Sequence, residues 1–167
     1  MRYAGLIKND LAAAPGVCTT LFVQGCPLHC HGCHNKDAWD FNGGAEFTDE
    51  TIEAIVSALH ANGIDRTLCV MGGEPLAPQN QNGVLYFLTR VKDLSPDTKV
   101  WLWTGYELET IFSSVSNEST FAQIIEYVDT IVDGPYIERL RDVTLPHRGS
   151  SNQHIWHKIN DKWKMEE

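Results

Sequence analysis

One stretch of the sequence, Thr-Thr-Leu-Phe-Val-Gln-Gly-Cys at residues 19–26, passes from an apolar, β-branched run into a polar turn that contains glycine. The same passage recurs at residues 68–75, 100–106 and 128–135. Short apolar runs bounded by such turns are typical of buried strands, although periodicity alone does not separate them from buried helices. We therefore predict four strands, each followed by a polar turn.

Between these runs, apolar residues recur at helical spacing. Within residues 48–62, they fall at positions i, i+3, i+4 and i+7, which places them on one face of a helix that Thr48 can cap. The complete set of helix-forming positions is Ile52, Ile55, Val56 and Leu59, then Val84, Leu88 and Val91, then Leu108, Ile111, Phe112 and Val115, and last Phe121, Ile124 and Ile125.

Strands that alternate with helices predict an α/β fold, with a mostly parallel sheet and crossover helices. In such sheets the loops after the carboxyl ends of the strands form the ligand site. The four polar turns are therefore expected on one rim. With only four or five strands, the sheet would close into an incomplete (βα) barrel whose open side admits a large substrate.

Length and composition set further limits. A chain of 167 residues fits a single domain over residues 1–167, in which residues 144–167 form an extension or a hairpin around Trp156 and Trp163. The sequence has neither a secretory signal nor an apolar run near the roughly 20 residues of a membrane helix, so we expect a cytoplasmic protein with no membrane partner. The net charge of −9 argues against non-specific binding to nucleic acid.

Three of the five cysteines, Cys26, Cys30 and Cys33, fall within eight positions. Pro27 and Gly32 disfavour a regular helix there, so a loop that wraps a compact inorganic group is expected. Cluster irons are commonly held by cysteine thiolates, and three cysteines would leave one iron of a [4Fe–4S] cluster without a protein ligand. As in catalytic zinc sites, an open coordination position indicates a reactive metal centre.

Taken alone, the spacing fits zinc equally well, with His29, His31 or His34 as the fourth ligand. The preceding strand and the glycine turn after the next strand favour the iron–sulfur interpretation. Cys18 and Cys69 lie in apolar strand segments, and we interpret them as small buried residues.

The combination of Cys-x3-Cys-x2-Cys after a first strand and Gly72-Gly73-Glu74-Pro75 after a second resembles the radical S-adenosylmethionine superfamily. The resemblance implies that the amino and carboxylate groups of S-adenosylmethionine chelate the open iron and that the glycine turn contacts the amino group. A reduced cluster would then cleave the cofactor into methionine and a 5′-deoxyadenosyl radical. That radical must form in a closed site beside its target.

Further segments in matching order closely resemble one branch, the activating proteins of anaerobic ribonucleoside-triphosphate reductases. They are Pro15-Gly16, Cys33-His34-Asn35-Lys36, Pro78-Gln79-Asn80, Trp101-Leu102-Trp103-Thr104-Gly105-Tyr106, Val132-Asp133-Gly134 and Arg148-Gly149-Ser150-Ser151-Asn152-Gln153. The resemblance implies an oxidoreductase that forms a glycyl radical on the large subunit of the reductase. It also implies a low-potential electron donor such as flavodoxin or ferredoxin.

Specific roles follow for individual residues. Cys26, Cys30 and Cys33 are the expected cluster ligands. The expected contacts of S-adenosylmethionine are Gly32, Cys33, His34, Gly72, Gly73 and Glu74. Asp133 ends a predicted strand on the reactive rim, where it either contacts the cofactor or caps the turn. Trp101, Trp103 and Tyr106 either line a channel for the target or belong to the core, and Arg148 either meets the partner or lies in a solvated loop.

Two departures keep other functions open. His34 stands where the reductase branch commonly has tyrosine, and Glu74 where it often has aspartate. Both features resemble the activase of pyruvate formate-lyase, a longer protein, which is the second candidate. A radical enzyme that acts on a small molecule, such as a deazaguanine-forming one, and a zinc-stabilised interaction module without catalysis are the remaining alternatives.

Overall fold

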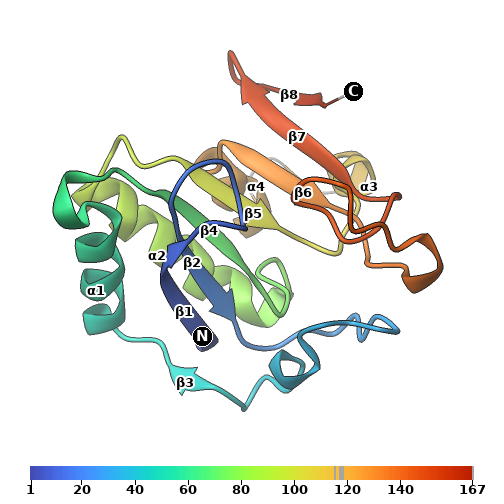
Figure 1. Cartoon of the computed structure of the whole chain (residues 1–167), viewed down its shortest axis with the longest axis horizontal. Helices are drawn as coiled ribbons and strands as arrows, with labels where there is room; N and C mark the ends of the chain where they lie inside the picture. The colour runs from blue at the N-terminus through green and yellow to red at the C-terminus, as the bar shows by residue number, and fades with distance from the viewer. Residues whose placement is uncertain (115, 117–118, 167) are drawn as a thin grey trace.

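The computed structural model describes residues 1–114, 116 and 119–166. Within them, the strands form one sheet in the order β3-β1-β2-β4-β5-β6-β7-β8 (Figure 1). The strands are β1 (Arg2–Asp10), β2 (Cys18–Val23), β3 (Ala45–Glu46), β4 (Thr67–Gly72), β5 (Val100–Trp103), β6 (Thr130–Asp133), β7 (His154–Ile159) and β8 (Lys162–Met165). The helices are α1 (Asp49–Leu59), α2 (Pro78–Leu94), α3 (Leu108–Ser114) and α4 (Thr120–Glu126).

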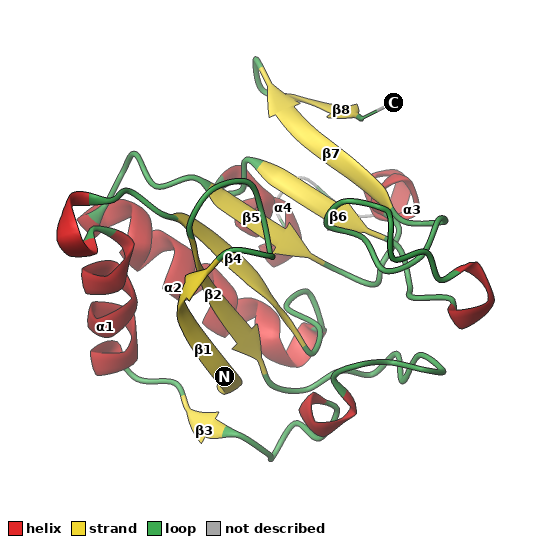
Figure 2. Ribbon diagram, viewed as in Figure 1, coloured by secondary structure: helices red, strands yellow, loops and turns green. Residues whose placement is uncertain are grey.

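The centre of the sheet is parallel and its two edges are antiparallel. β2, β4, β5 and β6 pair in parallel, and these are the four predicted strands. Helices connect them, as the alternating pattern predicts: α1 precedes β4, α2 precedes β5, and α3 and α4 precede β6 (Figure 2). The sheet is open, and the sequence prediction of a mostly parallel sheet holds for this central region alone.

One edge adds two strands that the sequence pattern did not indicate. β1 pairs with β2 antiparallel, with two irregularities of register, and β3 pairs with β1. β1 carries Arg2, Lys8 and Asp10 and is exposed along much of its length, so it lacks the continuous apolar run on which strand prediction rests. At the opposite edge, β7 and β8 form the antiparallel hairpin predicted around Trp156 and Trp163.

The helices lie against one face of the sheet, where they enclose the main core. Alternate residues of the central strands point into this core, for example Leu68 and Val70 of β4 and Leu102 of β5. They meet the apolar faces of α1, α2 and α4, which supply Ile52, Ile55, Leu59, Val84, Phe87, Leu88, Val91, Phe121, Ile124 and Ile125. The predicted helical stripes are thus confirmed with two exceptions: Phe112 of α3 is exposed, and Val115 lies outside the described residues.

The opposite face of the sheet carries a smaller apolar cluster, formed by Ala14, Cys18 and Cys69 with Met71, Trp101 and Trp103 packed around it. Cys18 and Cys69 are fully buried, which confirms their interpretation as small core residues. Among the described residues, no helix combines the length and apolar character needed to cross a membrane.

Candidate functional site

The polar turns that follow the four parallel strands meet at one end of the sheet, as predicted. They surround a cavity of about 270 Å³. Its lining includes Cys26, Cys30, Cys33, His34, Met71, Gly72, Gly73, Glu74, Trp103, Thr104, Gly105, Gly134, Tyr136, His147, Gly149 and Gln153. In Figure 1 the loops that leave the arrowheads of β2, β5 and β6 lie at this same end. The cavity therefore joins segments that are more than a hundred residues apart in the sequence.

Backbone hydrogen bonds fix the start of the cysteine loop. The N–H of Gly25 donates to the carbonyl of Ala38 at 2.8 Å, and the N–H of Cys26 donates to Trp39 at 3.0 Å. Cys26 is buried, whereas Cys30 and Cys33 are half-buried. Burial raises the pKa of the Cys26 and Cys30 thiols above the ordinary value. Without a metal, these two thiols therefore stay protonated at neutral pH.

Two buried amides, which the sequence analysis gave no role, hold this loop in place. Gln24 donates from Nε2 to the carbonyls of Asp37 and Asp40, at 3.0 and 2.7 Å. Asn80, in the first turn of α2, donates from Nδ2 to the carbonyls of Gln24, Gly25 and Glu74. The position of Asn80 after a Pro-Gln pair was visible in the sequence, but its contacts depend on tertiary packing.

The two glycines after β4 are required by close packing of the protein's own backbone. Gly72 has φ +107°, and a Cβ there would lie 2.7 Å from Cα of Phe22. A Cβ on Gly73 would meet the carbonyl group of Gly25, with 2.9 Å to its carbon, and would lie 3.0 Å from the carbonyl oxygen of Ala38. The absence of a Cβ thus lets this turn pack directly against the base of the cysteine loop.

Glu74 links this turn to the turn after β5. Its carboxylate accepts hydrogen bonds from the N–H of Leu76 at 2.9 Å, from Oγ1 of Thr104 at 2.8 Å and from the N–H of Gly105 at 2.7 Å. Burial raises the pKa of Glu74 to about 7, and the three hydrogen bonds only partly oppose this shift. Near neutral pH the group is therefore divided between its protonated and ionised forms.

Gly32 and Asp133, two of the predicted cofactor contacts, do not line the cavity. Gly32 has φ +75°, and a Cβ there would lie 2.7 Å from Oε1 of Glu138. Asp133 is buried, and its carboxylate accepts from the N–H of Leu108 at 2.7 Å and contacts Nδ1 of His154 at 3.2 Å. It therefore fixes the start of α3 and of β7, which matches the turn-capping interpretation.

The histidines of the cysteine loop have different surroundings. His29 stacks on Trp39 with ring centroids 4.6 Å apart, and His31 contacts Glu138 at 2.7 Å through Nδ1. Only His34 lines the cavity. Within the described residues, no three side chains of the histidine, cysteine, aspartate or glutamate type are close enough together to form a finished metal site. The three thiols line the same cavity, but they do not form a group that is close enough to hold a metal ion.

The aromatic residues of the Trp-Leu-Trp-Thr-Gly-Tyr segment divide between the cavity wall and the apolar clusters of the fold. Trp103 lines the cavity and donates from Nε1 to the carbonyl of His147 at 2.9 Å. Trp101 packs beside it on the same face of the sheet, 5.2 Å from the ring of His147. Tyr106 packs against the main core. Only Trp103 therefore faces the candidate site.

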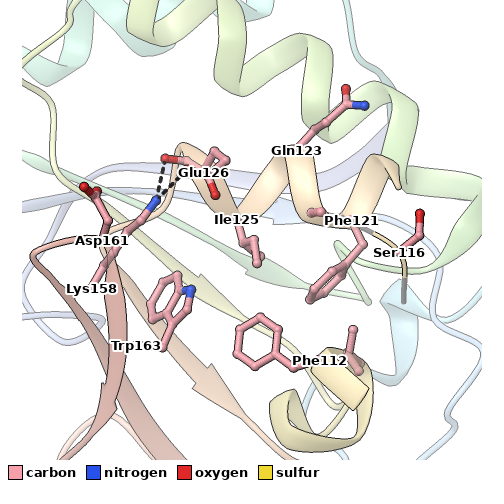
Figure 3. Close-up of a pocket in the computed structure, with 11 residues that line it drawn as sticks. Phe112, Ser116, Phe121, Gln123, Ile125, Glu126, Lys158, Asp161 and Trp163 are labelled. Carbon is pink, nitrogen blue, oxygen red and sulfur yellow. Dashed lines mark hydrogen bonds and ion pairs between the residues drawn. The ribbon is translucent and has the colours of Figure 1, made fainter. Parts of the chain in front are cut away.

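A second cavity, of about 280 Å³, lies between α3, α4 and the β7–β8 hairpin. Figure 3 shows Phe112, Phe121 and Trp163 around it. At one end, Nζ of Lys158 forms an ion pair with Glu126 at 3.0 Å. Among the described residues, no cysteine lines this cavity, and Lys158 is already paired with Glu126. The thiols therefore make the first cavity the candidate site.

Comparison with known proteins finds matches along most of the chain. The family model of a 4Fe-4S single cluster domain matches residues 12–156. Three curated relatives bear the name anaerobic ribonucleoside-triphosphate reductase-activating protein. That of Escherichia coli K12 is 35% identical over 94% of this chain and 99% of its own length. That of Pasteurella multocida is 39% identical over 93% and 97%, and that of bacteriophage T4 is 35% identical over 98% and 99%.

Proposed function

Because this chain belongs to the family of anaerobic ribonucleoside-triphosphate reductase-activating proteins and carries a 4Fe-4S domain, we propose that it is an enzyme that activates such a reductase by radical chemistry. The reaction uses a [4Fe–4S] cluster and S-adenosylmethionine, and it forms a glycyl radical on the large reductase subunit. One observation carries the proposal: three thiols and the glycine turn after β4 line the same cavity.

The residues of the cavity fit an iron–sulfur cluster. The donor set consists of Cys26, Cys30 and Cys33, and thiolates are the usual ligands of such clusters. The backbone N–H of Asn35 donates to Sγ of Cys33 at 3.4 Å, a contact that stabilises a thiolate. A structural zinc site would need a fourth protein ligand, and the match to a 4Fe-4S domain favours the cluster.

The protein's contribution is to position the cofactor and to exclude water. Cys26, Cys30 and Cys33 would hold the cluster, which would supply the electron for cleaving S-adenosylmethionine to methionine and the radical that abstracts hydrogen from the target glycine. Gly72 and Gly73 line the cavity beside the thiols, where their turn would receive the amino acid part of S-adenosylmethionine. Glu74 lies next to that space as an acidic group, and His34 lies at the cavity wall for the adenine.

The open sheet suits a large substrate. In this proposal the sheet is an incomplete barrel of the radical S-adenosylmethionine type, with helices outside and the cavity inside. A glycyl radical is delocalised between amide nitrogen and carbonyl, so its C–H bond is weaker than that of a primary carbon, and hydrogen transfer to the deoxyadenosyl radical is downhill. The curated relatives favour the reductase over pyruvate formate-lyase as the target.

The test is electron paramagnetic resonance on the large reductase subunit. We expect the anoxically reconstituted, reduced protein with S-adenosylmethionine to produce a glycyl radical doublet on that subunit. The Cys30→Ser variant should produce none, because the cluster loses one of three ligands. The control is Cys18→Ser, whose hydroxyl can keep the contact that Sγ of Cys18 makes with the carbonyl of Ala14 at 3.5 Å. A doublet of wild-type size with Cys30→Ser would contradict the proposal.

A further inference from the structure

The turn after β6, at residues 134–137, is held by three side chains of the segment Arg-Gly-Ser-Ser-Asn-Gln at residues 148–153. Each side chain bonds a different backbone group of the turn. The bonds run from Nε2 of Gln153 to the carbonyl of Gly134 at 3.0 Å, from Nδ2 of Asn152 to that of Pro135 at 2.8 Å, and from the N–H of Ile137 to Oγ of Ser150 at 3.2 Å. Together they fix the backbone on both sides of Tyr136.

Tyr136 joins this turn to the cysteine loop. Burial raises the pKa of the Cys30 thiol, and a hydrogen bond from the backbone N–H of Tyr136 to its sulfur opposes that rise. Two residues after Tyr136, Glu138 contacts Nδ1 of His31 at 2.7 Å. The start of the cysteine loop is fixed by backbone bonds of its own, whereas the part around Cys30 rests on the turn after β6.

The amide of Gln153 uses both of its ends. Oε1 accepts from the N–H groups of Gly149 and Ser150 at 2.8 and 3.2 Å, while Nε2 donates to Gly134. The side chain therefore couples its own segment to the turn after β6, and it lines the cysteine-lined cavity together with Tyr136. Because the amide is neutral, replacing it by alanine removes these bonds without changing the charge beside the thiols.

We propose that Gln153 and Asn152 are positioning residues for the iron–sulfur cluster. They hold the turn after β6 so that the N–H of Tyr136 donates to the sulfur of Cys30. The inference rests on the proposed function, in which Cys30 is a cluster ligand. Hydrogen bonds to the sulfurs of a cluster help to set its reduction potential. Because the reduced cluster is the more negative form, such a donor stabilises it and raises the potential.

The experiment compares Gln153→Ala and Asn152→Ala with the control Asn9→Ala, each in the full chain. Oδ1 of Asn9 accepts from Nε and Nη2 of the buried Arg66 at 3.1 and 2.8 Å, away from the cavity, so the control loses hydrogen bonds of the same kind elsewhere. Each protein is reconstituted anoxically and its iron is measured. The reduction potential of the cluster is then determined by redox titration followed with electron paramagnetic resonance, and the unfolding of the metal-free protein by urea titration.

We expect both turn variants to hold a cluster whose reduction potential lies below that of the wild type. Asn9→Ala should keep the wild-type potential, although it too loses stability. A turn that only became looser would admit water, which stabilises the more negative reduced cluster and raises the potential. A potential at or above that of the wild type in the turn variants would therefore overturn the inference alone.

Two further outcomes also decide. Loss of iron from both turn variants, with iron retained by Asn9→Ala, would support the inference, because Cys30 would no longer be held in place. If urea titration shows that Gln153→Ala does not fold, the potential of Asn152→Ala decides by itself. If the wild type takes up no iron, the proposed function and this inference fail together.

Discussion

Glu74 lines the candidate site, and the burial of its carboxyl group also affects the stability of the fold. It is fully enclosed, and its carboxylate joins the turns after β4 and β5 through three hydrogen bonds. A carboxylate in this position carries a desolvation cost that hydrogen bonds to neutral donors do not cancel. A cationic amino group beside it, such as that of S-adenosylmethionine, would offset that cost.

The stability of the metal-free protein should depend on the titration of this carboxyl. Burial raises the pKa of Glu74 from 4.5 to about 7, so between these values the folded state holds a proton that the unfolded state has released. The free energy of unfolding therefore falls as pH rises from about 4.5 to 7, by on the order of 3 kcal/mol.

Glu74→Gln should remove this part of the pH dependence, because the amide does not ionise. It should also lose the bond from the N–H of Gly105, since one carboxylate oxygen becomes an NH2 group. Urea unfolding of both metal-free proteins at pH 5 and pH 8 measures the difference. The account is wrong at this residue if the variant loses as much stability between the two pH values as the wild type.

At the residue scale, the sequence predicts best those positions at which the chemistry allows only one type of residue. The thiols and the glycine turn could be read from spacing alone, and the structure places them around one cavity. Gln24 and Asn80 could not be assigned a role, because an amide that donates to carbonyls of distant loops has no local sequence signal. Asp133 was ambiguous for the same reason: its contacts with Leu108 and His154 match capping, and its contact with the cofactor stays a prediction.

Among the elements, the turn after β4 and the start of the cysteine loop behave as one unit. The N–H of Glu74 donates to the carbonyl of Gly25 at 2.8 Å, and that of Gly73 donates to Val23 at 2.7 Å. The two segments approach so closely that glycine at position 73 is a packing requirement of the fold.

Gly73→Ala should therefore separate the two segments. The new methyl group would meet backbone atoms of Gly25 and Ala38, which cannot rotate away, so we expect a loss of about 2 kcal/mol in the free energy of unfolding. Iron binding after anoxic reconstitution should fall as well, because the base of the cysteine loop moves.

Gly5→Ala is the matched control, since a Cβ on Gly5 would lie 3.9 Å from Cδ2 of Phe22, an ordinary contact distance. It should change the free energy of unfolding by less than about 0.5 kcal/mol and leave iron binding unchanged. Denaturant unfolding and iron analysis of both variants check the prediction. Equal stability and iron content for Gly73→Ala and Gly5→Ala would show that the close approach is unimportant.

The parallel strands and their helices were predictable because each buries an apolar run or stripe. The antiparallel edge strands were less predictable from the sequence. β1 is half-exposed and carries charges, and its place in the sheet is set by pairing with β2 rather than by its own pattern. Only the tryptophans of the late segments indicated the hairpin of β7 and β8.

At the scale of the whole molecule, the open sheet and, within the described residues, one cysteine-lined cavity at the strand ends support the proposed action on another protein. Within the described residues, the second cavity offers no sulfur ligand. The cavity at the strand ends, of about 270 Å³, is too small for a folded domain. The net charge of −9 belongs to this scale, because charge steers two proteins before any contact forms.

The central claim, that this chain uses S-adenosylmethionine to take a hydrogen atom from a glycine of the reductase, is tested most directly by following that atom. The large reductase subunit is prepared with α-deuterated glycine and mixed, without oxygen, with the reduced protein and S-adenosylmethionine. The account predicts that deuterium appears in the 5′-deoxyadenosine product, detected by mass spectrometry, as the glycyl radical forms. 5′-Deoxyadenosine free of deuterium beside a glycyl radical, or a radical formed without 5′-deoxyadenosine, would contradict it.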